Sequence, residues 1–243
     1  MKPFLLLATR AEDAAADGEY AAFLEAGGLE PPELVRVRLE SRPLPDLDLD
    51  DYSGIIVGGS PFNASDPVES KSAVQRRVER ELDALLDTVV ATDFPFLGAC
   101  YGVGLLGTHQ NGTVDRQWPE PVGPTRVTVT PDGLDDGIFD GLGSQFDAFV
   151  GHKEACAVLP AGATLLATGT ACPIQAFRIK SNVYATQFHP ELTVTGIVER
   201  IRVYRDYGYF APDEMDDLIQ SIESAPFDGP SGLVRSFVER YAR

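Results

Sequence analysis

The stretch that decides the fold runs from Phe94 to Gly107 and reads Phe-Pro-Phe-Leu-Gly-Ala-Cys-Tyr-Gly-Val-Gly-Leu-Leu-Gly. Residues 95–97 predict a short apolar strand, and residues 103–106 predict the start of a helix. The glycines between them permit a sharp turn, which places Cys100 at a strand-to-helix corner. A side chain at such a corner stands clear of the sheet, and this is a favourable position for a nucleophile.

The surroundings of Cys100 predict a reactive thiol. Unpaired N–H groups and the positive dipole end of the following helix would lower the pKa of the thiol toward neutrality. The alternative is a small buried core cysteine between the turn glycines Gly98 and Gly102. The stretch by itself favours that simpler interpretation, and a second motif reverses the choice.

The second motif is Gln-Phe-His-Pro-Glu at residues 187–191, which ends an apolar strand predicted over 183–188. Pro190 biases His189 toward extended backbone, and alternate side chains of an extended chain share one face. His189 and Glu191 can therefore point the same way. His-Pro-Glu alone is an ordinary surface turn, but together with the corner cysteine it predicts a triad. His189 would accept the thiol proton, and Glu191 would fix the imidazole tautomer.

These motifs resemble those of the class I glutamine amidotransferases, the triad-type glutaminase family that includes the glutaminase portion of GMP synthetase. The resemblance rests on residues 98–102, on residues 187–191 and on Gly-Gly-Ser-Pro at residues 58–61, in matching order. It covers about residues 50–195 closely. It implies an α/β, flavodoxin-like fold with a mainly parallel, doubly wound sheet flanked by helices, and a site at the carboxyl ends of the strands.

The resemblance also implies further site residues. The backbone N–H of Gly59 would form an oxyanion hole with that of Tyr101, since two preset N–H groups stabilise a developing negative charge. Gly58 and His152 would border the substrate. For His152, a hydrogen-bonded loop histidine without a direct role is an equal alternative.

Gly104 departs from the family pattern, in which a glutamine four residues after the nucleophile helps to bind the glutamine substrate. Loss of that contact leaves polar groups of the substrate unpaired, at a cost of about 1 to 3 kcal/mol. A pocket widened beside Cys100 could instead admit a γ-glutamyl substrate with a larger leaving group. Alternatively, a neighbouring loop such as residues 151–154 supplies the lost contact.

Hydrophobic periodicity predicts the other elements. We expect strands at residues 3–8, 34–39, 53–57, 126–130, 146–150, 164–168, 174–179 and 183–188, and helices at 19–26, 70–91, 194–207, 213–223 and 231–243. The 243 residues suit one domain, with a core of residues 1–192 and a C-terminal helical extension of residues 193–243.

Net charge and cysteine content limit the partners and the cellular compartment that we expect for this protein. The formal net charge of −17 argues against nucleic acid or an anionic membrane as a partner. Three cysteines without metal-ligand spacing predict no metal and no disulfide framework, and they are typical of a reducing cytoplasm. No apolar run approaches the ~18 residues that span a bilayer. We expect no cofactor.

Three functions fit the sequence, in descending order. The first is a glutamine amidotransferase in which Cys100 attacks the glutamine side-chain amide and a thioester is then hydrolysed. Its ammonia would serve a separate synthase, since the sequence holds no phosphate-cradling glycine-lysine loop. The second is a stand-alone γ-glutamyl hydrolase or peptidase with the same triad. The third is a non-catalytic binding or regulatory protein. The sequence identifies neither the ammonia acceptor nor the oligomeric state, and a homo-oligomer is one possibility.

Overall fold

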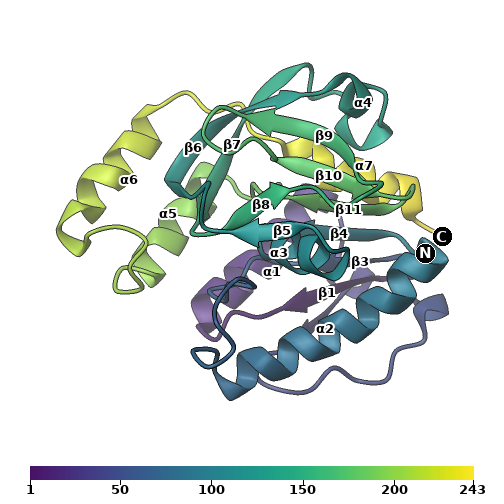
Figure 1. Cartoon of the computed structure of the whole chain (residues 1–243). Helices are drawn as coiled ribbons and strands as arrows, with labels where there is room; N and C mark the ends of the chain where they lie inside the picture. Colours follow the sequence, from purple (N-terminus) through teal and green to yellow (C-terminus); the bar gives the residue numbers. More distant parts are fainter.

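A nine-stranded sheet forms the centre of the molecule, with helices on both of its faces (Figure 1). The computed structural model describes residues 1–243, apart from the side chain of Ser231. The strands lie in the order β2 (Leu34–Arg38), β1 (Phe4–Ala8), β3 (Gly54–Val57), β4 (Phe96–Ala99), β11 (Val183–Thr186), β10 (Ala176–Ile179), β9 (Thr164–Gly169), β6 (Glu120–Val129) and β7 (Gln145–His152).

The sheet has a parallel half and an antiparallel half. Strands β2, β1, β3, β4 and β11 pair in parallel, and the pairs from β11 to β7 are antiparallel. All five residues of β1 are buried, as expected for a parallel strand that is covered on both faces. In the register of β4 and β11, Ala99 lies opposite Thr186. The two sequence motifs therefore follow adjacent strand ends.

The helices bury the two faces of the sheet separately. Phe4 and Leu6 point into one core with α1 (Asp13–Gly27) and α7 (Ser231–Tyr241). Leu5 and Leu7 point into the other core with α2 (Ala73–Thr92) and α3 (Tyr101–His109). This alternation follows from the two-residue period of a strand. Each fully buried leucine or phenylalanine contributes roughly 1.5 to 3 kcal/mol.

Helix α2 shows how the sequence sets the bounds of an element. The Ser72 side chain accepts a hydrogen bond from Gln75 N–H at 3.0 Å and so caps the first turn. Val78, Leu82, Leu86 and Val89 recur on its buried face, and the chain leaves the helix at Asp93 in a left-handed conformation with φ 54°. The helix predicted over residues 70–91 is thus confirmed with a small shift.

Two predicted helices have different bounds in the structure. Helix α1 begins at Asp13, six residues before the predicted start, because Gly18 interrupts its apolar pattern without ending the helix. Helix α5 (Val194–Val203) ends four residues before the predicted end at 207. Of the aromatic residues that follow α5, Tyr204, Tyr209 and Phe210 line the cavity at Cys100, whereas Tyr207 is exposed. Strand β6 starts at Glu120 rather than 126, across an irregular register between Glu120 and Gly123.

The smaller elements lie at the edges of the layers. Strands β5 (Thr113–Asp115) and β8 (Ala155–Val158) form a separate two-stranded sheet, and the short helices are α4 (Pro131–Leu134) and the 3-10 turns Pro31–Glu33, Leu49–Asp51, Gly137–Phe139 and Pro212–Glu214. The β10–β11 hairpin turns at Lys180, with φ 52°, as predicted for residues 180–182. Among the described helices, none has the length and apolar character needed to cross a lipid bilayer.

The C-terminal residues fall into two parts. Helix α7 belongs to the main core, where the Phe237 ring lies 5.9 Å from the Phe4 ring between centroids. Helices α5 and α6 (Met215–Ser224) form a smaller apolar cluster with Phe149 beyond β6 and β7 (Figure 1). Helix α7 therefore acts as a structural cover of the sheet. The division at residue 192 stays a prediction.

Candidate active site

Cys100 occupies the predicted corner between β4 and α3. Its φ of 54° and ψ of −83° lie outside the ordinary regions for a non-glycine residue, and its N–H donates to the Thr186 carbonyl at 2.7 Å. A Cβ on Gly98 would lie 2.7 Å from the Cα of Gly102. The strand and the helix can approach each other this closely because residue 98 has no side chain.

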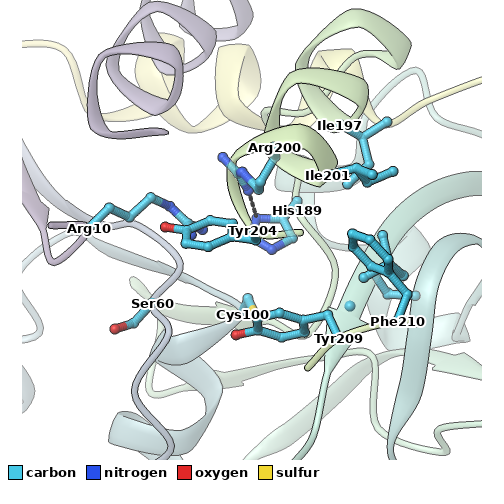
Figure 2. A pocket seen from close by; sticks show the side chains of 13 residues that line it. Arg10, Ser60, Cys100, His189, Ile197, Arg200, Ile201, Tyr204, Tyr209 and Phe210 are labelled. Atoms are coloured by element: carbon cyan, nitrogen blue, oxygen red, sulfur yellow. Dashed lines mark hydrogen bonds between the residues drawn. The ribbon is translucent and has the colours of Figure 1, made fainter. Parts of the chain in front are cut away.

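His189 and Glu191 share one face of an extended segment, as the His-Pro-Glu motif predicts. The Nδ1 of His189 lies 2.9 Å from Glu191 Oε1, and the His189 backbone N–H donates to Phe149 at 2.9 Å. Cys100 and His189 line the same cavity (Figure 2). With the Nδ1 proton donated to Glu191, the Nε2 of the neutral ring is a proton acceptor.

Burial sets the protonation states of the three groups. It raises the pKa of the Cys100 thiol to about 12, with a further rise from Glu191, although Arg10 opposes the change. Burial also lowers the pKa of His189. The resting pair is therefore a thiol and a neutral imidazole, and the expected lowering of the thiol pKa is wrong. Part of Cys100 remains accessible, but the sulfur lies deep in a cavity whose cover the sequence did not reveal.

Glu191 is ionised in spite of its burial. Burial raises the pKa of this carboxyl, but His189 and then Arg200 lower it more strongly, so that it lies at about 2. Arg200 Nη1 lies 3.4 Å from Glu191 Oε1. A buried carboxylate of this kind stabilises an imidazolium that forms beside it.

A buried ion cluster surrounds the Glu191 carboxylate, and sequence reasoning missed it. Arg10 Nε donates to Glu19 Oε1 at 2.8 Å, and Arg10 Nη1 donates to the Tyr204 hydroxyl at 3.0 Å. Together with Arg200 and Glu191 the cluster holds two cations and two carboxylates, which meets the need of buried charges for partners. One signal was present in the sequence, since Arg10 lies two residues after the end of the buried strand β1.

Gly58 and Gly59 lie against this cluster. A Cβ on Gly58 would lie 2.4 Å from Glu19 Oε2, and a Cβ on Gly59 would lie 2.6 Å from both Arg10 Nη2 and His189 Cε1. The Gly59 N–H donates to Glu19 Oε1 at 3.1 Å. It can serve an oxyanion only after it leaves that carboxylate. Close packing leaves no room for a side chain at either position. Gly58 packs against the Glu19 carboxylate.

Tyr101 begins α3 directly after the nucleophile. Its backbone N–H is in the first helical turn, where N–H groups have no intrahelical acceptor. Its ring is buried and packs edge-on against Phe62, with 6.2 Å between ring centroids. Ser60 lines both cavities that meet at Cys100. The roles of Tyr101 and Gly59 as oxyanion donors stay predictions.

The His152 ring is buried in a polar cluster. Its Nδ1 lies 2.9 Å from the Glu154 carbonyl oxygen, and its Nε2 lies 3.0 Å from Glu120 Oε2. Gln175 also donates to Glu120 Oε2, at 2.6 Å. This geometry corresponds to the alternative of a hydrogen-bonded loop histidine. The side chain holds the loop in place, and a direct contact with substrate stays a prediction.

The same cluster contains a possible set of metal ligands. Ligand atoms of Glu120, His152 and Cys172 lie within 4.8 Å of one another, and all three residues are buried. However, the Glu120 oxygens already accept hydrogen bonds from His152, Gln175 and Thr125. These hydrogen bonds satisfy the carboxylate without an ion.

Glu154 fills the space beside Gly104. A Cβ on Gly104 would lie 2.7 Å from Glu154 Oε1 and 3.1 Å from the Ala64 Cβ. The Glu154 oxygens accept hydrogen bonds from the N–H groups of Ala64 and Ser65, each at 2.7 Å. Of the two alternatives for Gly104, the widened pocket is therefore wrong, because a carboxylate from the loop at residues 151–154 occupies that space. A contact of this loop with substrate stays a prediction.

Two cavities meet at the nucleophile. One is lined by His189, Arg200 and Tyr204, and the other by Tyr101, Gln187 and Glu154. Cys100, Ser60, Gly151 and Tyr209 line both, and Figure 2 shows the Tyr209 ring beside Cys100. Lys153 Nζ lies 4.5 Å from the centroid of the Tyr209 ring. The segment after α5 therefore covers the nucleophile, a contact that periodicity could not predict.

The chain resembles known proteins over a much longer stretch than the motifs. The model of the family "Glutamine amidotransferase class-I" matches residues 32–200. A glutamine-hydrolysing GMP synthase subunit of Thermoplasma acidophilum is 26% identical over 162 residues, which is 66% of this chain and 74% of that one. The GMP synthase of Thermosipho africanus is 30% identical over 124 residues, 51% of this chain and 23% of the relative. The chain thus spans only a small part of such full-length synthases.

Solved structures share the fold over nearly the whole chain. A glutamine amidotransferase of Thermotoga maritima has a TM-score of 0.77 at 20% identity, covering 99% of this chain and 98% of that one. A glutamine amidotransferase of Methylobacillus flagellatus has a TM-score of 0.71 at 20% identity, covering 100% and 96%. The α/β fold with helices on both faces of the sheet is confirmed, although only the half of the sheet from β2 to β11 is parallel. Since the family model spans most of the chain, the protein belongs to the glutamine amidotransferase class-I family.

Proposed function

We propose that the protein is a glutaminase that hydrolyses the side-chain amide of glutamine and supplies ammonia to a separate synthase. The observation that carries this proposal is the arrangement of Cys100 and His189 in one cavity, with His189 Nδ1 held 2.9 Å from Glu191. Membership in the amidotransferase family supports the choice of glutamine as substrate.

The first half-reaction forms a thioester. His189 Nε2 takes the proton of the Cys100 thiol as the sulfur bonds to the amide carbon, and the carbonyl oxygen becomes an oxyanion. The Tyr101 N–H stabilises that charge, together with the Gly59 N–H once it leaves Glu19. The imidazolium then protonates the amide nitrogen, the carbon–nitrogen bond breaks and ammonia leaves.

The second half-reaction returns the free enzyme. Water gives a proton to His189 Nε2 as its oxygen bonds to the thioester carbon. The carbon–sulfur bond then breaks, the sulfur regains its proton from His189, and glutamate leaves. Because burial raises the thiol pKa to about 12, attack requires the proton transfer to His189. The Glu191 carboxylate supports the imidazolium in both half-reactions.

The separate synthase is proposed from the relatives. The Thermoplasma protein is named as part of a GMP synthase made of separate chains, and this chain covers 74% of its length. An ammonia acceptor activated by another chain is therefore the simplest arrangement. A stand-alone γ-glutamyl hydrolase loses its rationale, since Glu154 fills the space that a larger leaving group would have used.

The test is the release of glutamate from glutamine by the purified chain, alone and with a candidate synthase. The wild type should release glutamate and ammonia in equal amounts, and Cys100→Ala should release neither. Cys156→Ala is the matched control, because Cys156 is a buried cysteine that lines neither cavity at the nucleophile. Full activity of Cys100→Ala would contradict the proposal.

A further inference from the structure

We propose that Arg200 is a positioning residue that keeps the resting His189 ring neutral, with its single proton on Nδ1. The ring can then accept the thiol proton of Cys100 at Nε2 and pass it to the leaving nitrogen. The inference rests on the proposed glutaminase function and adds to it the residue that sets the charge of the base.

Arg200 lies on the inward face of α5. Its side chain is 11% exposed, and Ile197, three residues earlier on the same face, is buried. The helix begins just after Glu191, where the Thr193 side chain accepts a hydrogen bond from Gly196 N–H at 3.2 Å. Arg200 follows that cap by about two helical turns, and helical side chains lean toward the N-terminus. Its guanidinium therefore returns to the segment that holds Glu191.

The guanidinium lies closer to the imidazole than to any carboxylate. Arg200 Nη1 is 3.1 Å from His189 Nδ1, a contact that Figure 2 marks with a dashed line. The distances to Glu191 Oε1 and Glu19 Oε1 are 3.4 and 3.9 Å. An optimised bond from a cation to a carboxylate is about 2.7 to 2.9 Å, as in the 2.8 Å pair of Arg10 with Glu19. Arg200 is therefore more than the partner of a buried carboxylate.

Two groups compete for His189 Nδ1, which can take part in one hydrogen bond. Glu191 Oε1 is the nearer, at 2.9 Å, and this carboxyl is ionised. Nδ1 therefore carries the proton and donates it to Glu191. Arg200 then acts on the ring through its charge alone. A second proton on Nε2 would place two cations side by side with one carboxylate oxygen between them, which disfavours the imidazolium.

The other charges around the ring act in the same direction. The titratable and charged groups that contact the ring or line the cavity beside it are Glu191, Arg200, Arg10, Cys100, Tyr204 and Tyr209. Burial lowers the pKa of His189 most, Glu191 raises it, and Arg200 and then Arg10 lower it further. Arg10 is itself paired with Glu19. Arg200 is thus the nearest cation that opposes the effect of Glu191.

This balance suits both proton transfers of the proposed reaction. A carboxylate alone beside the ring would favour an imidazolium at rest, which cannot take the thiol proton. With Arg200 beside it, the ring is a free base at neutral pH, and the imidazolium that forms during the reaction gives up its proton more readily. Glu191 still fixes the tautomer and holds the ring in place.

The experiment is an NMR titration of the histidine ring nitrogens in the free protein. In the wild type, His189 should carry its proton on Nδ1 and should titrate below pH 6.5. In Arg200→Gln the midpoint should rise by about one pH unit, because a neighbouring like charge is removed. Arg200→Lys keeps the charge and should keep most of the low midpoint. The signal of His152, which is buried in a separate cluster, shows whether each variant is folded.

Arg202→Gln is the matched control, because Arg202 is exposed on the same helix and lines neither cavity at Cys100. It should titrate as the wild type does. The acidic limb of kcat/KM for glutamine should move to higher pH by the same amount in Arg200→Gln and should stay in place in Arg202→Gln. A purely structural role of Arg200 would lower activity at every pH and leave the limb where it is.

Three results would overturn the inference. The first is a wild-type ring with its proton on Nε2, which needs no variant to be seen. The second is an unchanged His189 midpoint in folded Arg200→Gln. The third is a folded Arg200→Lys that titrates as Arg200→Gln does. A wild type that shows the expected titration but hydrolyses no glutamine, with or without a synthase, would instead refute the proposed glutaminase function.

Discussion

The two sides of Cys100 differ in how their charges are satisfied. On the His189 side, Arg10 and Arg200 pair with Glu19 and Glu191 at 2.8 to 3.4 Å. On the other side, Glu154 has no ion pair among the described residues, and Gln187 Oε1 has no donor there. The two sides differ in charge balance rather than in hydrogen bonding, since Glu19 Oε2 and Glu191 Oε2 on the first side also accept no hydrogen bond. We therefore expect the chemistry on the first side and contacts with substrate on the second.

The largest loss of activity should follow from removing His189, the proposed base. We expect His189→Ala to lower kcat for glutamine by on the order of 10⁴-fold or more, since the residues of a triad act as a unit. Steady-state release of glutamate measures the loss. His109→Ala is the control, because this histidine lies at the far end of α3 beside Asp87. Comparable activity in the two variants would contradict the role of His189.

The next effect is on the free energy of unfolding, through the buried ion pair of Arg10 and Glu19. Glu19→Gln leaves Arg10 buried without its carboxylate, which should cost about 3 to 5 kcal/mol in the free energy of unfolding. Asp17→Asn removes an ion pair with Arg36 in which Asp17 is 68% exposed, and should cost less than about 1 kcal/mol. Urea denaturation of both variants makes the comparison. Equal losses would show that the buried cluster is not a structural requirement.

A smaller loss of stability is expected from crowding the space between Gly104 and Glu154. Gly104→Gln places a side chain where Glu154 Oε1 lies 2.7 Å from the Cβ position, and overpacking of this kind costs about 1 to 3 kcal/mol. The double variant Gly104→Gln/Glu154→Ala removes the clash and should regain most of that stability. Thermal denaturation measures both. If the double variant is less stable than Gly104→Gln, the two residues do not share one space.

The mildest change is a shift in pH dependence. His189 must be neutral to accept the thiol proton, and its pKa is lowered by burial from the ordinary value of 6.5. Catalysis is therefore lost only as the pH falls below 6.5, and kcat/KM should be level between about pH 7 and 9. Glu191 raises the pKa of His189, so Glu191→Gln should move the acidic limb to still lower pH. An acidic limb above pH 7 would contradict this assignment.

The placement of Cys100, His189 and Glu191, and of the strands beside them, was predictable because the signals are local. Gly98 and Gly102 mark the corner, and His-Pro-Glu fixes which side chains share a face. Apolar runs predicted the parallel strands, because a strand that is buried on both faces has a nearly continuous run of apolar residues. The start of α1 was missed because Gly18 interrupts the pattern.

Most surroundings of Cys100 and His189 were not predictable, because they arise from contacts between distant segments. The sequence raised only the position of the loop at residues 151–154 beside Gly104, as one of two alternatives. Glu19 reaches Gly59, and Glu154 reaches Ala64 and Gly104. A pattern along one segment carries no information about which side chain of another segment fills a space. The same reason explains the error on the thiol pKa, since the burial of Cys100 depends on Tyr209 and other residues far along the chain.

Mass spectrometry of the protein, quenched with acid during glutamine turnover, can detect the proposed intermediate itself. We expect a γ-glutamyl thioester on the peptide that contains Cys100, with none on the peptides of Cys156 or Cys172. Addition of hydroxylamine should remove it. Turnover of glutamine with an adduct on another cysteine, or with no adduct and unchanged activity in Cys100→Ala, would contradict the account.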